Sequence, residues 1–185
     1  RDIFPFWAIE CDYLKNFFLK KFYIYQFNSF LKIFDNIGVE SFSNIKYLQK
    51  KTNLTNITHL PNWIKKQKIN FKNKKIYNSF IFSGNLGGGQ DMEKVFNFFS
   101  TIKTSCNNSY LCVLGDGMNA TYLNKFQKLN INYNKKVSFE KYIKFLSKYE
   151  YGIISLKDEI QSVNYPGRLL TYLNSGLPII VLSNK

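Results

Sequence analysis

The sequence predicts an α/β protein built on parallel sheet with helices on both faces. After about residue 76, apolar runs of strand length alternate with amphipathic segments of helix length, which is the pattern of such a sheet. Of the 185 residues, 45% are hydrophobic and 21% are charged, so the chain can form a packed core and is not disordered. No apolar stretch reaches the roughly 18 residues that a membrane-spanning helix needs.

The first part of the chain is expected to hold two helices and two short strands. A long amphipathic helix is predicted over residues 13–35, strands at 37–39 and 57–60, and a second helix at 44–51. A core-facing position is favoured for the apolar stripe of the long helix, and insertion into a membrane surface is the alternative. The stripe consists of Phe17, Phe18, Phe22, Phe27, Phe30, Leu31 and Phe34.

The remainder of the chain is expected to alternate strands with helices. Strands are predicted at residues 79–82, 110–114, 136–139, 151–155 and 178–182, and helices at 91–103, 120–129, 141–148 and 168–174. Parallel sheets of this kind bind ligands beyond the carboxyl ends of their strands. The loops that follow the strands are therefore where we look for functional residues.

A domain boundary is predicted within residues 64–76, a polar run without clear periodicity. It lies in a basic stretch, because residues 46–75 hold nine lysines and no acidic residue. We assign residues 1–65 to one domain and residues 66–185 to a second. The chain begins inside an apolar pattern and stops just after a strand-like run, so we expect a fragment in which both domains are truncated.

The net charge and the few arginine, histidine and cysteine residues argue against nucleic-acid binding, zinc binding and triad catalysis. The formal net charge is +14, yet only Arg1 and Arg168 are arginine, and nucleic-acid readers rely on arginine, so no nucleic acid is expected as a partner. The lysines are interpreted as a solvated surface, with attraction to an anionic membrane surface as the alternative. One histidine and three scattered cysteines supply neither a zinc cluster nor a histidine-based triad, so we expect no metal and a reducing, cytoplasmic compartment.

Two glycine-rich loops follow predicted strands. Residues 83–90 read Ser-Gly-Asn-Leu-Gly-Gly-Gly-Gln and run into a helix. Glycines let the backbone approach a ligand, and N–H groups at a helix start favour an anion, although a flexible turn explains the loop equally well. No Gly-Lys-Ser/Thr follows, so this is not a Walker loop. Residues 114–117, Leu-Gly-Asp-Gly, form the second loop, which carries little information alone.

Arg168 stands out in the third loop. Pro166 signals a helix start, and Gly176 with Pro178 signals its end, so Arg168 lies in the first turn on the ligand side of the sheet. Lysine is the expected cation in this chain. An arginine here therefore favours a phosphate partner over an ordinary surface position.

Three blocks resemble the C-terminal domain of glycosyltransferase family 4. They are residues 82–87, Phe-Ser-Gly-Asn-Leu-Gly; residues 114–117; and residues 164–168, Asn-Tyr-Pro-Gly-Arg, which continue to Gly-Leu-Pro-Ile-Ile at 176–180. Residues 1–7, 37–41 and 60–63 resemble the family's acceptor-side domain. The branch that the chain most resembles is that of the N-acetylfucosamine-type transferases of bacterial surface polysaccharide synthesis.

The resemblance implies the GT-B fold, which is α/β with two Rossmann-like domains. Residues 1–65 would be the C-terminal part of the acceptor-side domain, and residues 66–185 a nucleotide-sugar-binding domain. It implies a retaining, metal-independent enzyme without a cofactor that moves a hexosyl or N-acetylhexosaminyl group from a nucleotide-sugar, expected to carry UDP. The implied partners are a lipid-linked or polysaccharide glycan acceptor and an anionic membrane surface, at the inner face of the cell membrane.

The resemblance also implies roles for individual residues. Arg168 would act on the donor diphosphate as the catalytic residue. The other implied substrate-binding residues are Gly84, Asn85, Gly87, Gly88 and Gln90 at the diphosphate, Gly115 and Gly117 near the nucleoside, and Asn164, Tyr165 and Thr171. The chain departs from the family in two ways: an arginine and a lysine of the first loop are replaced by Asn85 and Gln90, and the paired glutamates fall at Val163 and Thr171. Asp2 is a candidate acceptor-side group.

Two other function classes stay open. A degenerate member would bind nucleotide-sugar or membrane without turnover, and the missing glutamate pair keeps this hypothesis open. A sugar-nucleotide epimerase on the same architecture would need several acid–base groups in its cleft. The chain is poor in these, and Asp158 and Glu159 are interpreted as solvated.

Overall fold

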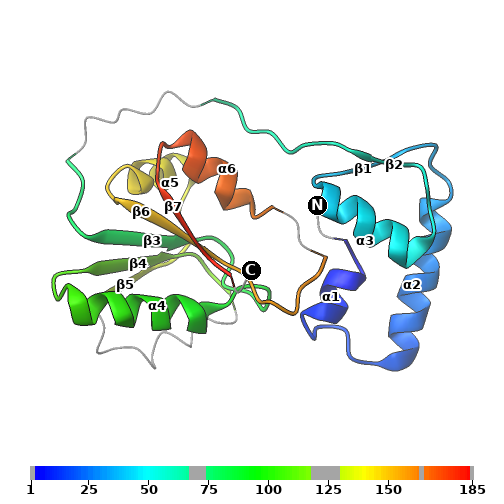
Figure 1. The fold of residues 1–185 in the computed structure, drawn as a ribbon, viewed down its shortest axis with the longest axis horizontal. Helices are drawn as coiled ribbons and strands as arrows, with labels where there is room; N and C mark the ends of the chain where they lie inside the picture. The colour runs from blue at the N-terminus through cyan, green and yellow to red at the C-terminus, as the bar shows by residue number, and fades with distance from the viewer. Residues whose placement is uncertain (1–2, 67–73, 118–129, 163–164, 184–185) are drawn as a thin grey trace. The chain divides into compact units, whose positions relative to one another are not determined.

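The computed structural model describes residues 3–66, 74–117, 130–162 and 165–183. The chain divides into two compact units (Figure 1), Arg1–Trp63 with Asp158–Tyr165, and Ile64–Lys157 with Pro166–Lys185. Residues 158–165 thus belong with the first unit, which nothing in the sequence indicated. The assignment of acceptor binding to one domain and of nucleotide-sugar binding to the other stays a prediction.

The second unit is built on a five-stranded parallel sheet with the order β5-β4-β3-β6-β7. Its described elements are β3 (Ser79–Ser83), α4 (Met92–Ser105), β4 (Tyr110–Leu114), β5 (Ile131–Asn134), α5 (Phe139–Leu146), β6 (Tyr151–Ser155), α6 (Gly167–Asn174) and β7 (Ile179–Leu182). The strand order changes direction between β3 and β6. Such a switch point is where sheets of this class open a crevice at their carboxyl edge.

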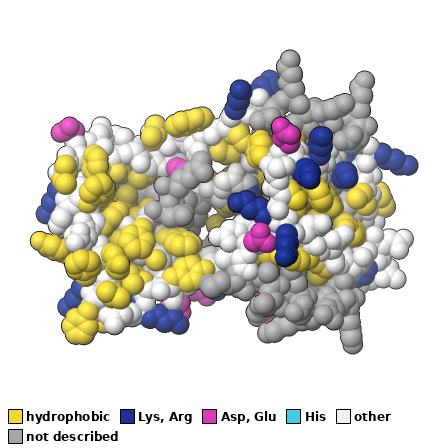
Figure 2. All heavy atoms as spheres, turned by 180° about the vertical axis from the view of Figure 1, so that it is seen from behind, with side chains coloured by type: hydrophobic (Ala, Val, Ile, Leu, Met, Phe, Trp, Pro, Cys, Tyr) yellow, Lys and Arg dark blue, Asp and Glu magenta, His cyan; other side chains and the backbone are white. Residues whose placement is uncertain are grey.

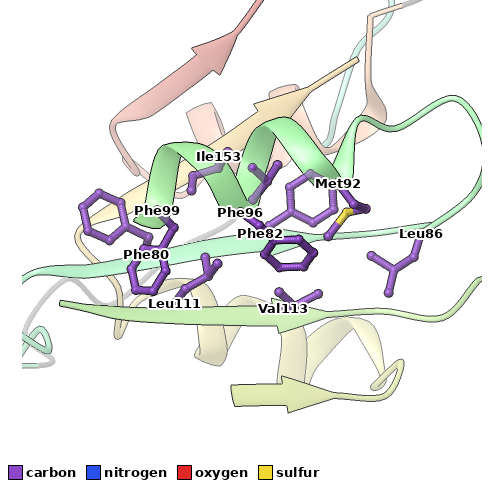
Figure 3. Packing of buried hydrophobic residues seen from close by; sticks show 10 residues of the cluster. Phe80, Phe82, Leu86, Met92, Phe96, Phe99, Leu111, Val113 and Ile153 are labelled. Carbon is purple, nitrogen blue, oxygen red and sulfur yellow. The ribbon is translucent and has the colours of Figure 1, made fainter. Parts of the chain in front are cut away.

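Both faces of this sheet are buried, because alternate residues of each strand point to opposite sides. One face packs against α4 (Figure 3) in a cluster of Phe80, Phe82, Leu86, Met92, Val95, Phe96, Phe99, Leu111, Val113 and Ile153. The other face packs against α5 and α6 in a cluster of Ile81, Cys112, Leu114, Leu146, Tyr149, Ile154, Tyr172 and Leu177. The two clusters hold the carboxyl ends of β3 and β4 in a fixed frame.

The first unit is smaller. Its elements are α1 (Phe6–Glu10), α2 (Phe17–Leu31), β1 (Ile37–Val39), α3 (Phe42–Thr52) and β2 (Ile57–His59), and β1 pairs with β2 in parallel. Side chains cap two of the helices, since Asn16 accepts hydrogen bonds at the start of α2 and Ser41 at the start of α3. A modest core is formed by Ile3, Phe6, Val39, Leu48 and Ile57.

The apolar stripe of α2 differs from the expectation. The helix is confirmed, but a core-facing position is wrong for most of the stripe, because Phe17, Phe18, Phe22 and Phe30 are exposed. Leu31 is buried, and Phe27 packs against the core of the first unit. Figure 2 shows apolar side chains gathered on the surface of the first unit, at the left of the view.

Most of the predicted elements are confirmed, and one strand is wrong. Residues 136–139 are not a strand; the strand of this region is β5, and Phe139 begins α5. Val137 and Phe139 alternate with polar residues and so resemble a strand, whereas β5 is a polar edge strand, Ile-Asn-Tyr-Asn. The predicted helix at 120–129 lies outside the described residues, and α1 was not predicted.

Candidate functional site

A pocket of about 660 Å³ opens at the carboxyl edge of the second unit's sheet. It lies beyond the ends of β3 and β4 and beside the first turns of α5 and α6. Its lining consists of Ser83, Gly84, Asn85, Leu114, Gly115, Asp116, Lys136, Val137, Phe139, Tyr142, Arg168 and Thr171. A cavity of this size can hold a small organic ligand.

Two glycine loops meet at the mouth of the pocket. The Gly84 N–H donates to the Leu114 carbonyl oxygen at 2.9 Å, and the Leu86 N–H donates to the Asp116 carbonyl oxygen at 2.9 Å. The loops therefore continue the pairing of β3 with β4 beyond the sheet. This leaves the pocket edge built of backbone, which a ligand can approach closely.

Glycine is required at two of these positions. A Cβ on Gly115 would collide with the carbonyl oxygen of Gly84, and a Cβ on Gly117 would stand 2.6 Å from the Leu86 carbonyl carbon. Both residues also have φ angles that L side chains rarely adopt, +152° and +154°. The Leu-Gly-Asp-Gly sequence is thus explained by the close approach of the two loops.

Arg168 faces this glycine edge from the first turn of α6. Its guanidinium lies over the Phe82 ring, with Cζ 4.5 Å from the ring centroid, and a Cβ on Gly84 would stand 3.1 Å from Nη2. Nη1 is buried and has no hydrogen-bond partner among the residues that the structure describes. Within the described residues, no carboxylate forms an ion pair with Arg168.

The electrostatics of Arg168 are those of a cation without a counter-ion in the described part of the chain. Burial lowers the pKa of its guanidinium from the ordinary value, and the phenol groups of Tyr172 and Tyr142 partly offset this shift. An arginine remains charged despite such a shift. An unpaired positive charge that is largely shielded from water is costly, and an anionic ligand in the pocket would relieve that cost.

Three hydroxyl groups form a connected cluster behind the glycine edge. The Ser83 Oγ lies 2.7 Å from the Tyr142 hydroxyl and 2.8 Å from the Tyr172 hydroxyl. The Ser83 N–H donates to the Tyr172 hydroxyl at 3.0 Å. Tyr172 is fully buried, and its ring packs closely against Gly152. A Cβ on Gly152 would stand only 2.5 Å from the Tyr172 Cδ2 atom. We call Ser83, Tyr142 and Tyr172 the hydroxyl cluster.

Asp116 and Lys136 add charge to the pocket wall. One Asp116 carboxylate oxygen accepts from the Lys136 N–H at 3.3 Å, and the other accepts from the Tyr133 hydroxyl at 3.4 Å. Lys136 is exposed and lines the pocket together with Arg168. These contacts hold the connection from β5 to α5 against the Leu-Gly-Asp-Gly loop.

The sequence-predicted site residues fall into three groups. Those that line the pocket are Gly84, Asn85, Gly115, Arg168 and Thr171. Those that belong to the same two loops without lining it are Gly87, Gly88, Gln90 and Gly117. Tyr165 is 51% exposed and belongs to the first unit, whereas Asn164 and Asp2 lie outside the described residues.

Sequence reasoning missed part of the pocket. The hydroxyl cluster, Lys136 and Asp116 were not named as candidates. Tyr142 and Tyr172 stand at helical positions where an aromatic residue usually means core, so only the three-dimensional contact with Ser83 identifies them. In the described part of the chain, no group of three or more histidine, cysteine or carboxylate side chains is arranged to hold a metal ion.

Comparisons with known proteins bear on the fold. No protein-family model matches the chain, and no curated protein matches it. Several solved structures, in contrast, match the chain. An S. aureus TarM variant in complex with fondaparinux, α-GlcNAc-glycerol and UDP is 11% identical, with a TM-score of 0.68 over 88% of this chain and 32% of its own. The pneumococcal O-GlcNAc transferase GtfA in complex with UDP and GlcNAc is 14% identical, with a TM-score of 0.69 over 86% of this chain and 32% of its own.

These neighbours have the GT-B fold. The chain has this fold as well. A third similar structure, the lipopolysaccharide outer core galactosyltransferase WaaB, gives a TM-score of 0.58 at 14% identity. The predicted fold class is thus confirmed. The chain spans about a third of the length of TarM and GtfA.

Proposed function

We propose that this chain is part of a glycosyltransferase that takes a sugar from a nucleotide-sugar, with UDP as the nucleotide. The single observation that carries the proposal is Arg168, a half-buried cation with a buried Nη1 and without a counter-ion in the described residues, which stands over a glycine backbone edge at a pocket. The solved neighbours support it, because two of them were solved with UDP. The pocket also lies where α/β sheets bind nucleotides.

The proposed chemistry follows from charge. When the bond between sugar and nucleotide breaks, negative charge grows on the departing diphosphate, and the sugar passes through an oxocarbenium-like state. A fixed guanidinium and backbone N–H groups stabilise the growing charge and need no rearrangement during the reaction. In our proposal Arg168 supplies the guanidinium, the loops of Gly84 and Gly115 supply the backbone, and transfer retains the anomeric configuration without a metal or cofactor.

We further propose a lipid-linked glycan acceptor at the inner face of the cell membrane, with a hexosyl or N-acetylhexosaminyl group as the transferred sugar. The nine lysines of residues 46–75 support attraction to an anionic surface. In the described residues, none of the helices has the length and apolar character needed to span a bilayer. Membership of glycosyltransferase family 4, in its N-acetylfucosamine-type branch of polysaccharide synthesis, is part of the same proposal.

A second candidate is binding of the nucleotide-sugar without turnover. The observation that favours it is Thr171, which lines the pocket at a position where the resemblance leads us to expect a glutamate. An epimerase has less support, because Asp116 is the one carboxylate in the described lining of the pocket. A turnover assay on the complete protein distinguishes the first two candidates.

Calorimetric titration with UDP tests the proposed site. We expect the parent chain to bind UDP and Arg168→Met to bind it about 10- to 100-fold more weakly, since hydrogen bonds to charged groups contribute about 1.5–3 kcal/mol. Lys144→Met is the matched control, because Lys144 is exposed and does not line the pocket. A parent chain that does not bind UDP, or an Arg168→Met variant that binds like Lys144→Met, would contradict the proposal.

A further inference from the structure

The hydroxyl cluster leads from the buried side of the sheet to the pocket. Tyr172 is fully buried on α6, Ser83 ends β3, and Tyr142 lines the pocket from α5. Ser83 and Tyr142 are 59 residues apart in sequence, and Ser83 and Tyr172 are 89 apart. Residues of three elements therefore meet at a tyrosine that lines the pocket.

The hydrogen atoms of this cluster can be arranged in two ways. In the first, Tyr142 donates to Ser83, Ser83 donates to Tyr172, and Tyr172 donates to the Ile81 carbonyl oxygen at 3.3 Å. In the second, Tyr172 donates to Ser83 at 2.8 Å and Ser83 donates to Tyr142 at 2.7 Å. The second arrangement leaves the Tyr142 hydroxyl hydrogen without an acceptor in the cluster.

The two arrangements share the two short contacts of Ser83 and differ by one hydrogen bond. The second arrangement gives up only the 3.3 Å bond to the Ile81 carbonyl oxygen, the longest of the three, and keeps both contacts of Ser83, which are close to the preferred O–H···O distance. In both arrangements Tyr172 also accepts from the Ser83 N–H, which fixes its position. An acceptor in the pocket would therefore release the Tyr142 hydroxyl hydrogen from the cluster at the cost of one long hydrogen bond.

We propose that Tyr142 is a ligand-binding residue that donates its hydroxyl hydrogen to a phosphate oxygen of a nucleoside diphosphate held by Arg168. This inference rests on the proposed function, and it adds a neutral donor to the cation. In this proposal Tyr172 and the Ser83 hydroxyl are positioning groups, because they act on the ligand through the Tyr142 hydroxyl.

The charge around Tyr142 favours an anionic acceptor. Burial raises the pKa of the Tyr142 hydroxyl, an effect that the hydrogen bond from Ser83 and the charge of Arg168 only reduce. The group therefore keeps its proton at neutral pH and can act as a donor. A hydroxyl donor that lines the same pocket as a guanidinium suits an oxygen that carries negative charge.

The test measures dissociation constants for inorganic pyrophosphate and for UDP on the chain and its variants. Tyr142→Phe removes one hydroxyl and keeps the ring, and we expect it to weaken binding of both probes roughly tenfold or more. Tyr151→Phe is the matched control. Tyr151 is the first residue of β6, so it lies at the amino end of the strands, whereas the pocket lies at their carboxyl end, and it does not line the pocket. It should bind both probes like the parent.

A second variant and two measurements of folding separate the loss of the hydroxyl from a loss of the fold. Ser83→Ala removes the partner that orients the Tyr142 hydroxyl, and we expect a smaller loss of pyrophosphate affinity than for Tyr142→Phe. Circular dichroism and thermal unfolding show whether each variant keeps its fold. Pyrophosphate binding by Tyr142→Phe at parental affinity overturns the inference and leaves the Arg168 result standing. A parent chain that binds neither probe overturns this inference and the proposed function together.

Discussion

The Glu10 carboxylate accepts hydrogen bonds from the Ser162 N–H at 2.9 Å and from the Ser162 hydroxyl at 2.6 Å, across 152 residues of sequence. The Gln161 N–H donates to the same oxygen at 3.1 Å, and the Tyr47 hydroxyl donates to the other at 2.7 Å. All of these residues belong to the first unit. One carboxylate thus fixes two backbone amides of the segment that leads towards Pro166.

Glu10→Gln is expected to loosen that segment. An amide has one acceptor oxygen in place of two, so some of the four donors lose their partner, at a cost of about 1–3 kcal/mol for each buried group. Hydrogen exchange followed by mass spectrometry should show faster exchange at Gln161 and Ser162, with the amides of β3 and β4 unchanged. Unchanged exchange at Gln161 and Ser162 would show that the carboxylate does not hold the segment.

Gly115→Ala is expected to disrupt the pocket edge. The added Cβ would meet the Gly84 carbonyl oxygen, and the φ of +152° would strain any side chain, so we expect a loss of at least about 2 kcal/mol in unfolding free energy. Chemical denaturation measures this loss. Gly167→Ala is the control: a Cβ there meets nothing within 4 Å, and the residue is helical, so a gain of about 0.4–1 kcal/mol is expected.

Cys112 is expected to be the slowest of the three cysteines to react with a thiol reagent. It is fully buried in β4, and burial raises the pKa of its thiol, so the reactive thiolate is scarce at pH 8. Cys11 and Cys106 are partly exposed. Because the pKa is raised on folding, the buried thiol contributes stability below its unfolded pKa, and this contribution falls as the pH rises through the folded value.

Peptide mapping after timed alkylation checks the order of reaction. Cys112 should be labelled only when denaturant unfolds the second unit. Labelling of Cys112 in the native protein as fast as that of Cys106 would contradict its position in the core between the sheet and α5.

The fold could be predicted where local pattern decides the structure. The alternation from Ser79 to Leu182 produced the parallel sheet, and the glycine loops with Arg168 carried the resemblance to GT-B enzymes. The strand predicted at 136–139 failed because Val137 and Phe139 alternate with polar residues, while the true edge strand β5 needs little apolar content. Periodicity reports burial, and an edge strand is only partly buried.

The parts of the fold and of the site that the sequence did not predict depend on contacts between residues far apart in the chain. Ser83, Tyr142 and Tyr172 are ordinary residues in the sequence, and their connection appears only when β3, α5 and α6 are brought together. The contact of Glu10 with Ser162 is of the same kind. For α2, the spacing of Phe17, Phe22 and Phe30 predicted a helix correctly, but spacing alone cannot tell which partner, if any, covers an apolar stripe.

Arg168→Ala is expected to lower turnover, in the complete enzyme, far more than it weakens binding of the nucleoside part. The diphosphate charge grows as the sugar leaves, so the guanidinium is worth more in the transition state than in the ground state. Loss of such a contact typically costs about 2.7–4 kcal/mol, or roughly 100- to 1,000-fold in rate.

Two further variants sharpen this prediction. Arg168→Lys should recover part of the rate, because it keeps the charge and loses the planar fork. Lys136→Met removes the other cation in the described lining of the pocket, but that side chain is exposed and screened by water, so its effect should be much smaller. The measurement is kcat with donor saturating. If Arg168→Ala kept nearly normal kcat, the growing charge would not be stabilised by Arg168, and the guanidinium would serve the packing against Phe82 and Gly84 instead. If Lys136→Met were as damaging as Arg168→Ala, the stabilisation would not be specific to Arg168.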